Sequence, residues 1–183
     1  RITDNGSGIP GEQVRVAFLR HATSKIRTVE DLLTSGTLGF RGEALSSIAA
    51  VCQVEMISKT AGSITGIRYI IEGGAEKSLE EIGAPEGTTF LVRNLFYHTP
   101  ARKKFLKSAA TEAGYVSDLI ERMALSNPQI SFKFINNNET KLHTSGNCNV
   151  KDIIYSIYGR EIAANVVKIE PEETQGLTVS GFI

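Results

Sequence analysis

Three strand-like runs follow one another in the middle of the chain, and this succession limits the folds available to it. The runs are residues 53–59, 65–72 and 88–92, which carry β-branched or aromatic residues and are separated by glycine-bearing turns. Apolar residues recur at helical spacing both before and after these runs. Because strands and helices mix without a regular parallel alternation, the sequence predicts an α+β fold.

The remaining elements follow from periodicity and from capping signals. Pro10 suits the first turn of a helix, Pro100 opens another, and Asn149 is placed to cap a helix that Gly159 ends. Helices are predicted over residues 10–21, 29–33, 42–49, 100–127 and 149–158, and further strands over 130–135, around 142, and over 163–170 and 177–183.

The polar loop over residues 144–147 is the best candidate for a domain boundary. It predicts a first domain over residues 1–145 and a second over residues 146–183. Residues 1–3 resemble the tail of a strand already under way, and the last run alternates like a strand and stops without a turn. We therefore expect both ends to continue in a longer protein.

Composition limits the classes of function. Twenty basic residues balance twenty acidic ones, so any contact with DNA must come from a local basic patch rather than from net charge. Cys52 and Cys148 lack the spacing of metal ligands, which favours a reduced, intracellular protein. No apolar stretch approaches the roughly 18 residues that would suggest a membrane span.

The turn Asp4-Asn5-Gly6-Ser7-Gly8 allows two interpretations. Asn-Gly is common in hairpins, so a simple turn is one of them. In the other, Asp4 presents a carboxylate to an amino group on a base, and the glycines let the backbone approach a flat ligand closely.

A second glycine-rich segment, residues 36–45, runs directly into a predicted helix. Free backbone N–H groups and the helix dipole favour anions at such a junction, so phosphate is the expected ligand, with a flexible linker as the alternative. The segment lacks the Gly-Lys-Ser/Thr ending of a Walker loop. A third segment, Glu86-Gly87-Thr88-Thr89, is interpreted as a turn when taken alone. It becomes a candidate binding motif only because it follows the other two segments in the chain.

In this order the segments resemble the nucleotide-binding motifs of the GHKL ATPases, which include gyrase, a class of heat-shock chaperones, histidine kinases and MutL. Residues 39–45, Gly-Phe-Arg-Gly-Glu-Ala-Leu, look like the MutL form of one motif. Residues 20–25 are similar to the lid segment of that family, and residues 95–106 to its other strong signature. The chain therefore resembles the MutL family of DNA mismatch repair proteins, and the resemblance thins after about residue 125.

The resemblance implies a fold and a ligand. It implies a GHKL (Bergerat) ATPase α/β sandwich over residues 1–145, followed by the start of a ribosomal-protein-like transducer domain. ATP and Mg²⁺ are the implied cofactors, with Asp4 on the adenine amino group and Thr88 supporting that contact through its hydroxyl and ordered water. The implied nucleotide-binding residues are Asp4, Gly6, Gly8, Thr23, Ser24, Lys25, Gly39, Phe40, Arg41, Gly42, Glu43, Ala44, Leu45 and Thr88.

The resemblance also indicates what these 183 residues do not carry. In the family, the general-base glutamate and the Mg²⁺ ligand lie on a helix upstream of the Asp4 turn, and a γ-phosphate lysine lies in the second domain. Glu43 belongs to the phosphate loop and is interpreted as structural rather than as a substitute base. We therefore expect the chain alone to bind ATP poorly and not to hydrolyse it.

A local basic segment offers a DNA contact. Arg102, Lys103, Lys104 and Lys107 lie within six positions, and a solvated helix face is the alternative to phosphate binding. The resembled family holds DNA in a basic groove without reading its sequence, which favours a DNA-binding role for this segment. Lys104, Lys107 and Arg102 are the predicted contacts, and DNA binding should weaken with added salt.

The implied parent protein is an ATP-driven switch. It forms a homodimer, or a heterodimer with a paralogue, and engages a mismatch-recognition protein of the MutS type. Its expected place is the cytoplasm and nucleoid of a bacterium, or the nucleus of a eukaryote. Two alternatives stay open: another GHKL enzyme, such as a topoisomerase subunit, and a non-enzymatic dimerisation scaffold that binds nucleotide weakly.

Overall fold

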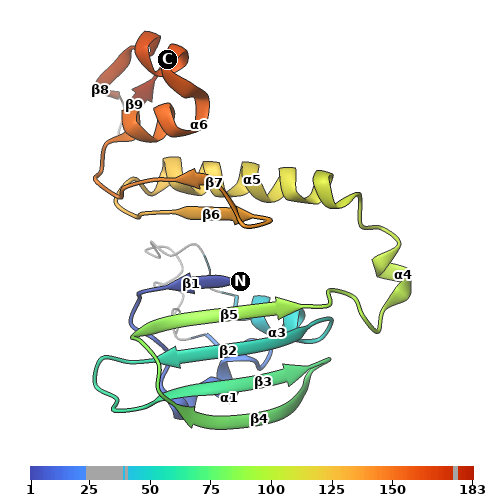
Figure 1. The fold of residues 1–183 in the computed structure, drawn as a ribbon. Coiled ribbons are helices and arrows are strands. Elements are labelled where there is room, and N and C mark those ends of the chain that lie inside the picture. The colour runs from blue at the N-terminus through green and yellow to red at the C-terminus, as the bar shows by residue number, and fades with distance from the viewer. Residues whose placement is uncertain (24–38, 40, 175–176) are drawn as a thin grey trace. The chain divides into compact units, whose positions relative to one another are not determined.

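The computed structural model describes residues 1–23, 39, 41–174 and 177–183. These residues form two compact units, Arg1–Phe105 and Leu106–Ile183. Figure 1 shows the helices and strands of both units. The domain boundary predicted near residue 145 is not the same as this division into compact units, and it stays a prediction.

The first unit contains a five-stranded sheet. Its strands, in spatial order, are β1 (Ile2–Asp4), β5 (Gly87–Arg93), β2 (Gln53–Lys59), β3 (Gly66–Glu72) and β4 (Ala75–Ile82). Every neighbouring pair is antiparallel. The predicted strand over residues 53–59 is confirmed, and those over 65–72 and 88–92 agree to within one residue at each end. The sheet supplies the β part of the predicted α+β fold.

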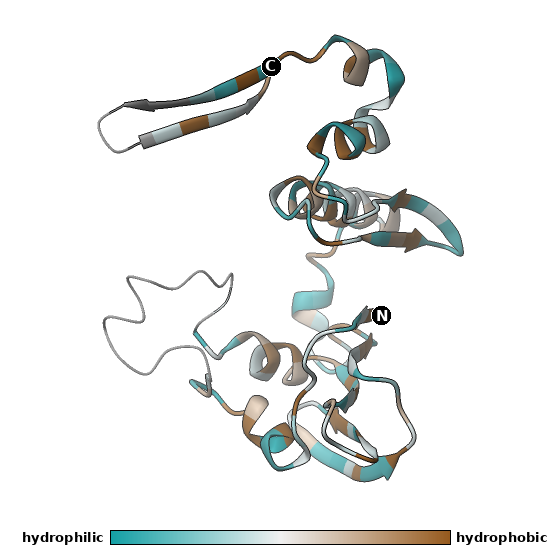
Figure 2. Ribbon diagram, turned by 90° about the vertical axis from the view of Figure 1, so that its left-hand side faces the viewer, coloured by the Kyte–Doolittle hydropathy of each residue, from teal (hydrophilic) through white to brown (hydrophobic). Residues whose placement is uncertain are grey.

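Helices cover one face of this sheet. These helices are α1 (Gly11–Ala17) and α3 (Ala44–Ala49). A third helix of this unit, α4 (Pro100–Lys103), follows β5 in the chain. Figure 2 shows α1 and α3 on the same side of the sheet, with hydrophobic residues on both. Val54 and Met56 on β2 are buried with Val14 of α1 and Ala49 of α3. The alternation of β2 thus directs every second side chain into one core.

The core joins the segments that the sequence singled out. Ile9, which follows the Asp4 turn, and Leu45, at the start of α3, both pack against it. Cys52 is 1% exposed within the core, and burial raises the pKa of its thiol.

The opposite face of the sheet carries a charged cluster. Glu55 on β2 accepts hydrogen bonds from Arg68 Nε of β3, at 2.8 Å, and from Arg93 Nη1 of β5, at 3.1 Å. These two bonds hold the pKa of the Glu55 carboxyl below its usual range. The three central strands are therefore bridged by ion pairs on this face and by apolar packing on the other.

The second unit combines two helices with two hairpins. Its elements are α5 (Ala109–Ser126), β6 (Lys133–Asn136), β7 (Glu139–His143), α6 (Val150–Asn165), β8 (Lys168–Thr174) and β9 (Leu177–Phe182). Ala124, Leu142 and Ile153 form its buried core. The predicted cap is confirmed, because Asn149 Oδ1 accepts from the N–H of Lys151 at 3.1 Å. Gly159, with φ 85°, interrupts the helix where its end was predicted, and a short helical segment continues beyond it.

Several predicted bounds are wrong. The first helix ends at Ala17 rather than near residue 21, and the helix expected from Pro100 to residue 127 is two helices, α4 and α5. Ser108 begins the second of these, since its hydroxyl accepts from the N–H of Thr111.

The later strands also differ from the prediction. The strand predicted over residues 130–135 begins at Lys133, and residues 163–165 are helical, so that β8 starts only at Lys168. The helix predicted over residues 29–33 lies outside the described residues.

Candidate nucleotide-binding site

Asp4 is held at the end of β1 by its own turn and by the neighbouring strand. The antiparallel register places Asp4 opposite Thr88, the second residue of β5. Its carboxylate oxygen Oδ1 accepts from the N–H of Gly6 at 2.9 Å and from the N–H of Thr88 at 3.1 Å. Oδ2 takes neither of these bonds, and the residue is exposed. A carboxylate fixed in this way can accept a hydrogen bond from a ligand without first reorganising.

Ser58 connects this region to the sheet interior. It is 1% exposed at the end of β2, and its hydroxyl oxygen accepts from the N–H of Ile9 at 2.7 Å. The same oxygen lies 3.0 Å from Thr88 Oγ1 and 3.2 Å from the carbonyl oxygen of Gly87. Ser58 is not among the residues predicted from the sequence. The available signal was a hydroxyl at the buried position that follows Val54 and Met56 in the alternation of β2.

Two glycines allow the backbones to approach closely here. Gly8 has φ +71°, and a Cβ at this position would lie 2.2 Å from the carbonyl oxygen of Lys59. Gly87 has φ +105°, and its Cβ would lie 2.2 Å from the carbonyl oxygen of Asp4. Side chains are excluded at both positions. We refer to Asp4, Gly6, Gly8, Ser58, Gly87 and Thr88 as the aspartate cluster.

A second set of predicted residues gathers around the start of α3. Gly42 has φ +65°, and its Cβ would lie 2.3 Å from the carbonyl oxygen of Ala22. Glu43 Oε1 lies 3.2 Å from His21 Nδ1, and both side chains are at least half exposed. We refer to residues 21–23, 39 and 41–45 as the glycine-loop cluster. The structure thus joins the segment after α1 to the segment that enters α3.

The predicted site residues are therefore divided between two clusters. The aspartate cluster contains Asp4, Gly6, Gly8 and Thr88, and the glycine-loop cluster contains Thr23, Gly39 and Arg41 to Leu45. Thr23, Gly39 and Arg41 are exposed and have interactions of their own. The remaining predicted residues, Ser24, Lys25 and Phe40, lie outside the described residues.

The basic segment is exposed to solvent. Arg102 lies in α4, Lys104 follows that helix, and Lys107 precedes α5. Their side chains take part in none of the ion pairs formed within the described residues. Positive charges without an internal partner can contact an external anion.

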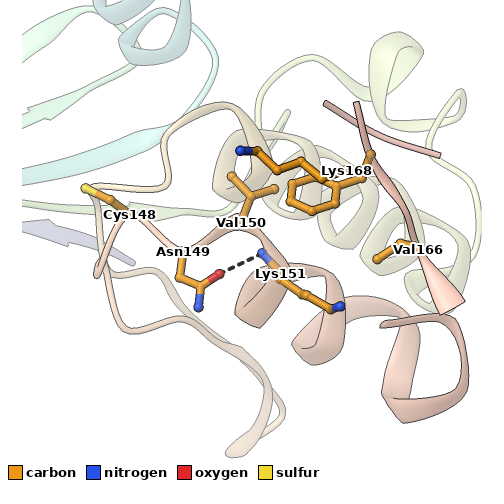
Figure 3. A pocket seen from close by; sticks show the side chains of 7 residues that line it. Cys148, Asn149, Val150, Lys151, Val166 and Lys168 are labelled. Carbon is orange, nitrogen blue, oxygen red and sulfur yellow. Dashed lines mark hydrogen bonds between the residues drawn. The ribbon is translucent and has the colours of Figure 1, made fainter. Parts of the chain in front are cut away.

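A cavity of about 480 Å³ lies in the second unit (Figure 3). It is lined by Cys148, Asn149, Val150, Lys151, Val166, Lys168 and Phe182. Its residues match none of the predicted site residues, and Lys168 Nζ is paired with Glu170 at 3.1 Å. The candidate site therefore consists of the two clusters of the first unit.

In the part of the chain that the structure describes, His, Cys, Asp and Glu side chains form no group of three or more that could hold a metal ion. No described helix is both long and apolar enough to cross a membrane.

The chain is similar to curated DNA mismatch repair proteins MutL over its whole length. It is 64% identical over 183 residues to MutL of Agathobacter rectalis and 47% identical over 183 residues to MutL of Clostridium botulinum. All of this chain is covered in both comparisons, and it spans 28% and 27% of the length of these relatives. No family model matches the chain.

Solved structures give the same result for the fold. The Aquifex aeolicus MutL ATPase domain complexed with ADP matches with a TM-score of 0.68 and 26% sequence identity. The match covers 91% of this chain and 57% of that one.

Three features define a GHKL-type ATPase fold. They are an antiparallel sheet with helices on one face, an aspartate at the end of an edge strand, and a Gly-Thr pair beside that aspartate. The segment Gly-Phe-Arg-Gly-Glu-Ala-Leu and the identity over the whole chain narrow the class. The chain belongs to the MutL family of DNA mismatch repair proteins.

Proposed function

We propose that this chain supplies most of the ATP-binding surface of a MutL-type switch in DNA mismatch repair. The observation that carries the proposal is the Asp4 carboxylate, with Oδ1 held by two N–H groups and Oδ2 directed to neither. Such a carboxylate suits the amino group of adenine. The ADP complex of the Aquifex aeolicus domain supports nucleotide as the ligand class.

The glycine-loop cluster is proposed to bind the phosphates. Its residues reach the start of α3 through Gly42, whose lack of a Cβ permits the close approach to Ala22. Backbone N–H groups at such a junction favour phosphate oxygens. Thr23, Ser24 and Lys25 complete the proposed nucleotide contacts, together with Phe40 and Arg41.

Hydrolysis is assigned to the full-length protein. Mg²⁺ would neutralise phosphate charge there, and the family resemblance places its ligand and the general base upstream of Asp4. Glu43 is close to His21, which supports a structural role for this glutamate rather than a catalytic one. In this proposal ATP biases a conformational equilibrium, through which the protein dimerises and engages a partner of the MutS type at the bacterial nucleoid.

The test compares ligand binding by the full-length protein and its Asp4→Asn variant. Calorimetric titration with a non-hydrolysable ATP analogue and Mg²⁺ should give binding that the variant loses, because an amide N–H₂ would face the amino group of adenine. The N–H groups of Gly6 and Thr88 can still donate to the amide oxygen, so the fold should be retained. An absence of binding by the unchanged protein would leave the dimerisation scaffold as the better account.

DNA contact is a second proposed property, supported by the exposed basic segment. Arg102, Lys104 and Lys107 should bind phosphates without reading bases. Replacing Lys104 by Gln should weaken binding to all sequences alike and lower the salt dependence by about one counterion. Lys77→Gln, which changes an exposed lysine of β4, is the matched control. Equal effects of the two changes would show that the segment has no special role.

A further inference from the structure

The Ser58 hydroxyl has three polar neighbours, and the chemistry of each limits where protons can lie. The N–H of Ile9 can only donate, at 2.7 Å, and the carbonyl of Gly87 can only accept, at 3.2 Å. The third neighbour, Thr88 Oγ1 at 3.0 Å, can do either. A serine hydroxyl has one proton and accepts at most two hydrogen bonds.

One arrangement alone satisfies all three contacts. Ser58 accepts from Ile9 and must give its single proton to the carbonyl of Gly87. Thr88 must then donate its own proton to Ser58. Because Ser58 is 1% exposed and Thr88 is 7% exposed, water competes little for these positions. Thr88 thus donates its hydroxyl proton to Ser58, and Thr88 Oγ1 can offer a ligand only its lone pairs.

We propose that Ser58 is a specificity-determining residue of the base site, acting through Thr88. This inference rests on the proposed function, namely that adenine lies beside Asp4. Asp4 Oδ2 accepts hydrogen bonds, and Ser58 makes Thr88 an acceptor as well. Two acceptors side by side suit an exocyclic amino group, which carries two hydrogens. They disfavour a 6-oxo group, which has none to offer.

The discriminating experiment measures the ratio of ADP to IDP affinity in the full-length protein, since IDP carries a 6-oxo group in place of the amino group. The unchanged protein should prefer ADP. In Ser58→Ala the Thr88 proton is released and can turn toward the 6-oxo group, so the preference should fall about tenfold. A purely structural loss would weaken both ligands equally and leave the ratio unchanged.

Two variants serve as controls for this ratio. Thr89→Val removes a hydroxyl one position along β5, where it bonds Thr3 Oγ1 on the other face of the sheet, and should leave the ratio unchanged. Ser58→Thr keeps a hydroxyl at the buried position and should keep the preference. Ser58→Cys replaces the hydroxyl by a weak donor and acceptor, and it tests the same point if the alanine variant fails to fold.

The outcomes separate this inference from the proposed function. If neither ADP nor IDP binds to the unchanged protein, the proposed function fails. If ADP binds in preference to IDP and Asp4→Asn abolishes that binding, an unchanged ratio in folded Ser58→Ala and Ser58→Cys overturns the role of Ser58 alone. A fall in the ratio that Thr89→Val does not share establishes the role.

Discussion

The aspartate cluster and the glycine-loop cluster belong to one unit but are held together by different means. Asp4 and Thr88 are 84 positions apart and are joined by strand register and by a hydrogen bond to the carboxylate, with buried Ser58 beneath them. The glycine-loop cluster depends on the approach of Gly42 to Ala22 and on the exposed pair of His21 and Glu43. The part of the site assigned to the base is therefore built into the sheet, whereas the part assigned to phosphate is carried by exposed turns.

The largest expected effect concerns the backbone of the aspartate cluster. Gly87→Ala would place a Cβ 2.2 Å from the carbonyl oxygen of Asp4, in a backbone conformation that side chains rarely adopt. We expect a loss of roughly 3 kcal/mol or more in the free energy of unfolding, because β1 and β5 must separate.

Gly83→Ala is the control for this change, since a Cβ there meets nothing within 4 Å. Urea unfolding of both variants measures the difference. Similar stabilities would show that the close approach of β1 and β5 does not hold the cluster.

A smaller loss of stability is expected when the ion pairs of Glu55, on the face of the sheet opposite the core, are removed. Hydrogen bonds from Arg68 and Arg93 hold the pKa of Glu55 below that of an ordinary glutamate. A lowered folded-state pKa gives stability that is present at neutral pH and lost as pH falls through that pKa. Glu55→Gln should therefore be less stable than the unchanged protein by up to about 1 kcal/mol at pH 7, and the difference should shrink as pH falls below about 4, where an unperturbed glutamate takes up its proton.

Thermal unfolding across this pH range measures the effect of Glu55. Glu80→Gln is the matched control, because Glu80 lies 3.8 Å from Arg68 and is more exposed than Glu55. A Glu55→Gln defect that stays the same size from pH 7 to pH 3 would exclude the ion pairs as its cause.

The smallest expected effect concerns the glycine-loop cluster. The side chains of His21 and Glu43 are 77% and 51% exposed, so their pairing is screened by water. Glu43→Gln should change the free energy of unfolding by no more than about 0.5 kcal/mol. A loss comparable to that of Gly87→Ala would contradict the view that this cluster is the more loosely held of the two.

The sequence predicted those elements whose pattern is regular and clearly bounded. Strand β2 was predicted at its observed bounds because residues 53–59 form a strand-like run that a glycine-bearing turn separates from the next one. Strand β4 was not predicted, because Ala75–Ile82 is rich in charged residues and none of them is fully buried. It forms because Gly73 and Gly74, both with positive φ, return the chain alongside β3.

Short motifs predict residues of the site, but they do not predict how those residues are connected. Asp4 and Thr88 were identified from short motifs, which say nothing about register between strands 84 positions apart. Ser58 was missed because a lone serine at the end of an apolar alternation has no local signature. Its role depends on three neighbours that only the folded sheet brings together.

The measurement that tests the division of the site most directly is amide hydrogen exchange in the full-length protein, with adenosine and with ADP. We expect adenosine alone to protect residues 4–9 and 87–90, and ADP to protect residues 39–45 in addition. Protection of residues 39–45 by adenosine, or no protection around Asp4 and Thr88 with either ligand, would contradict the account.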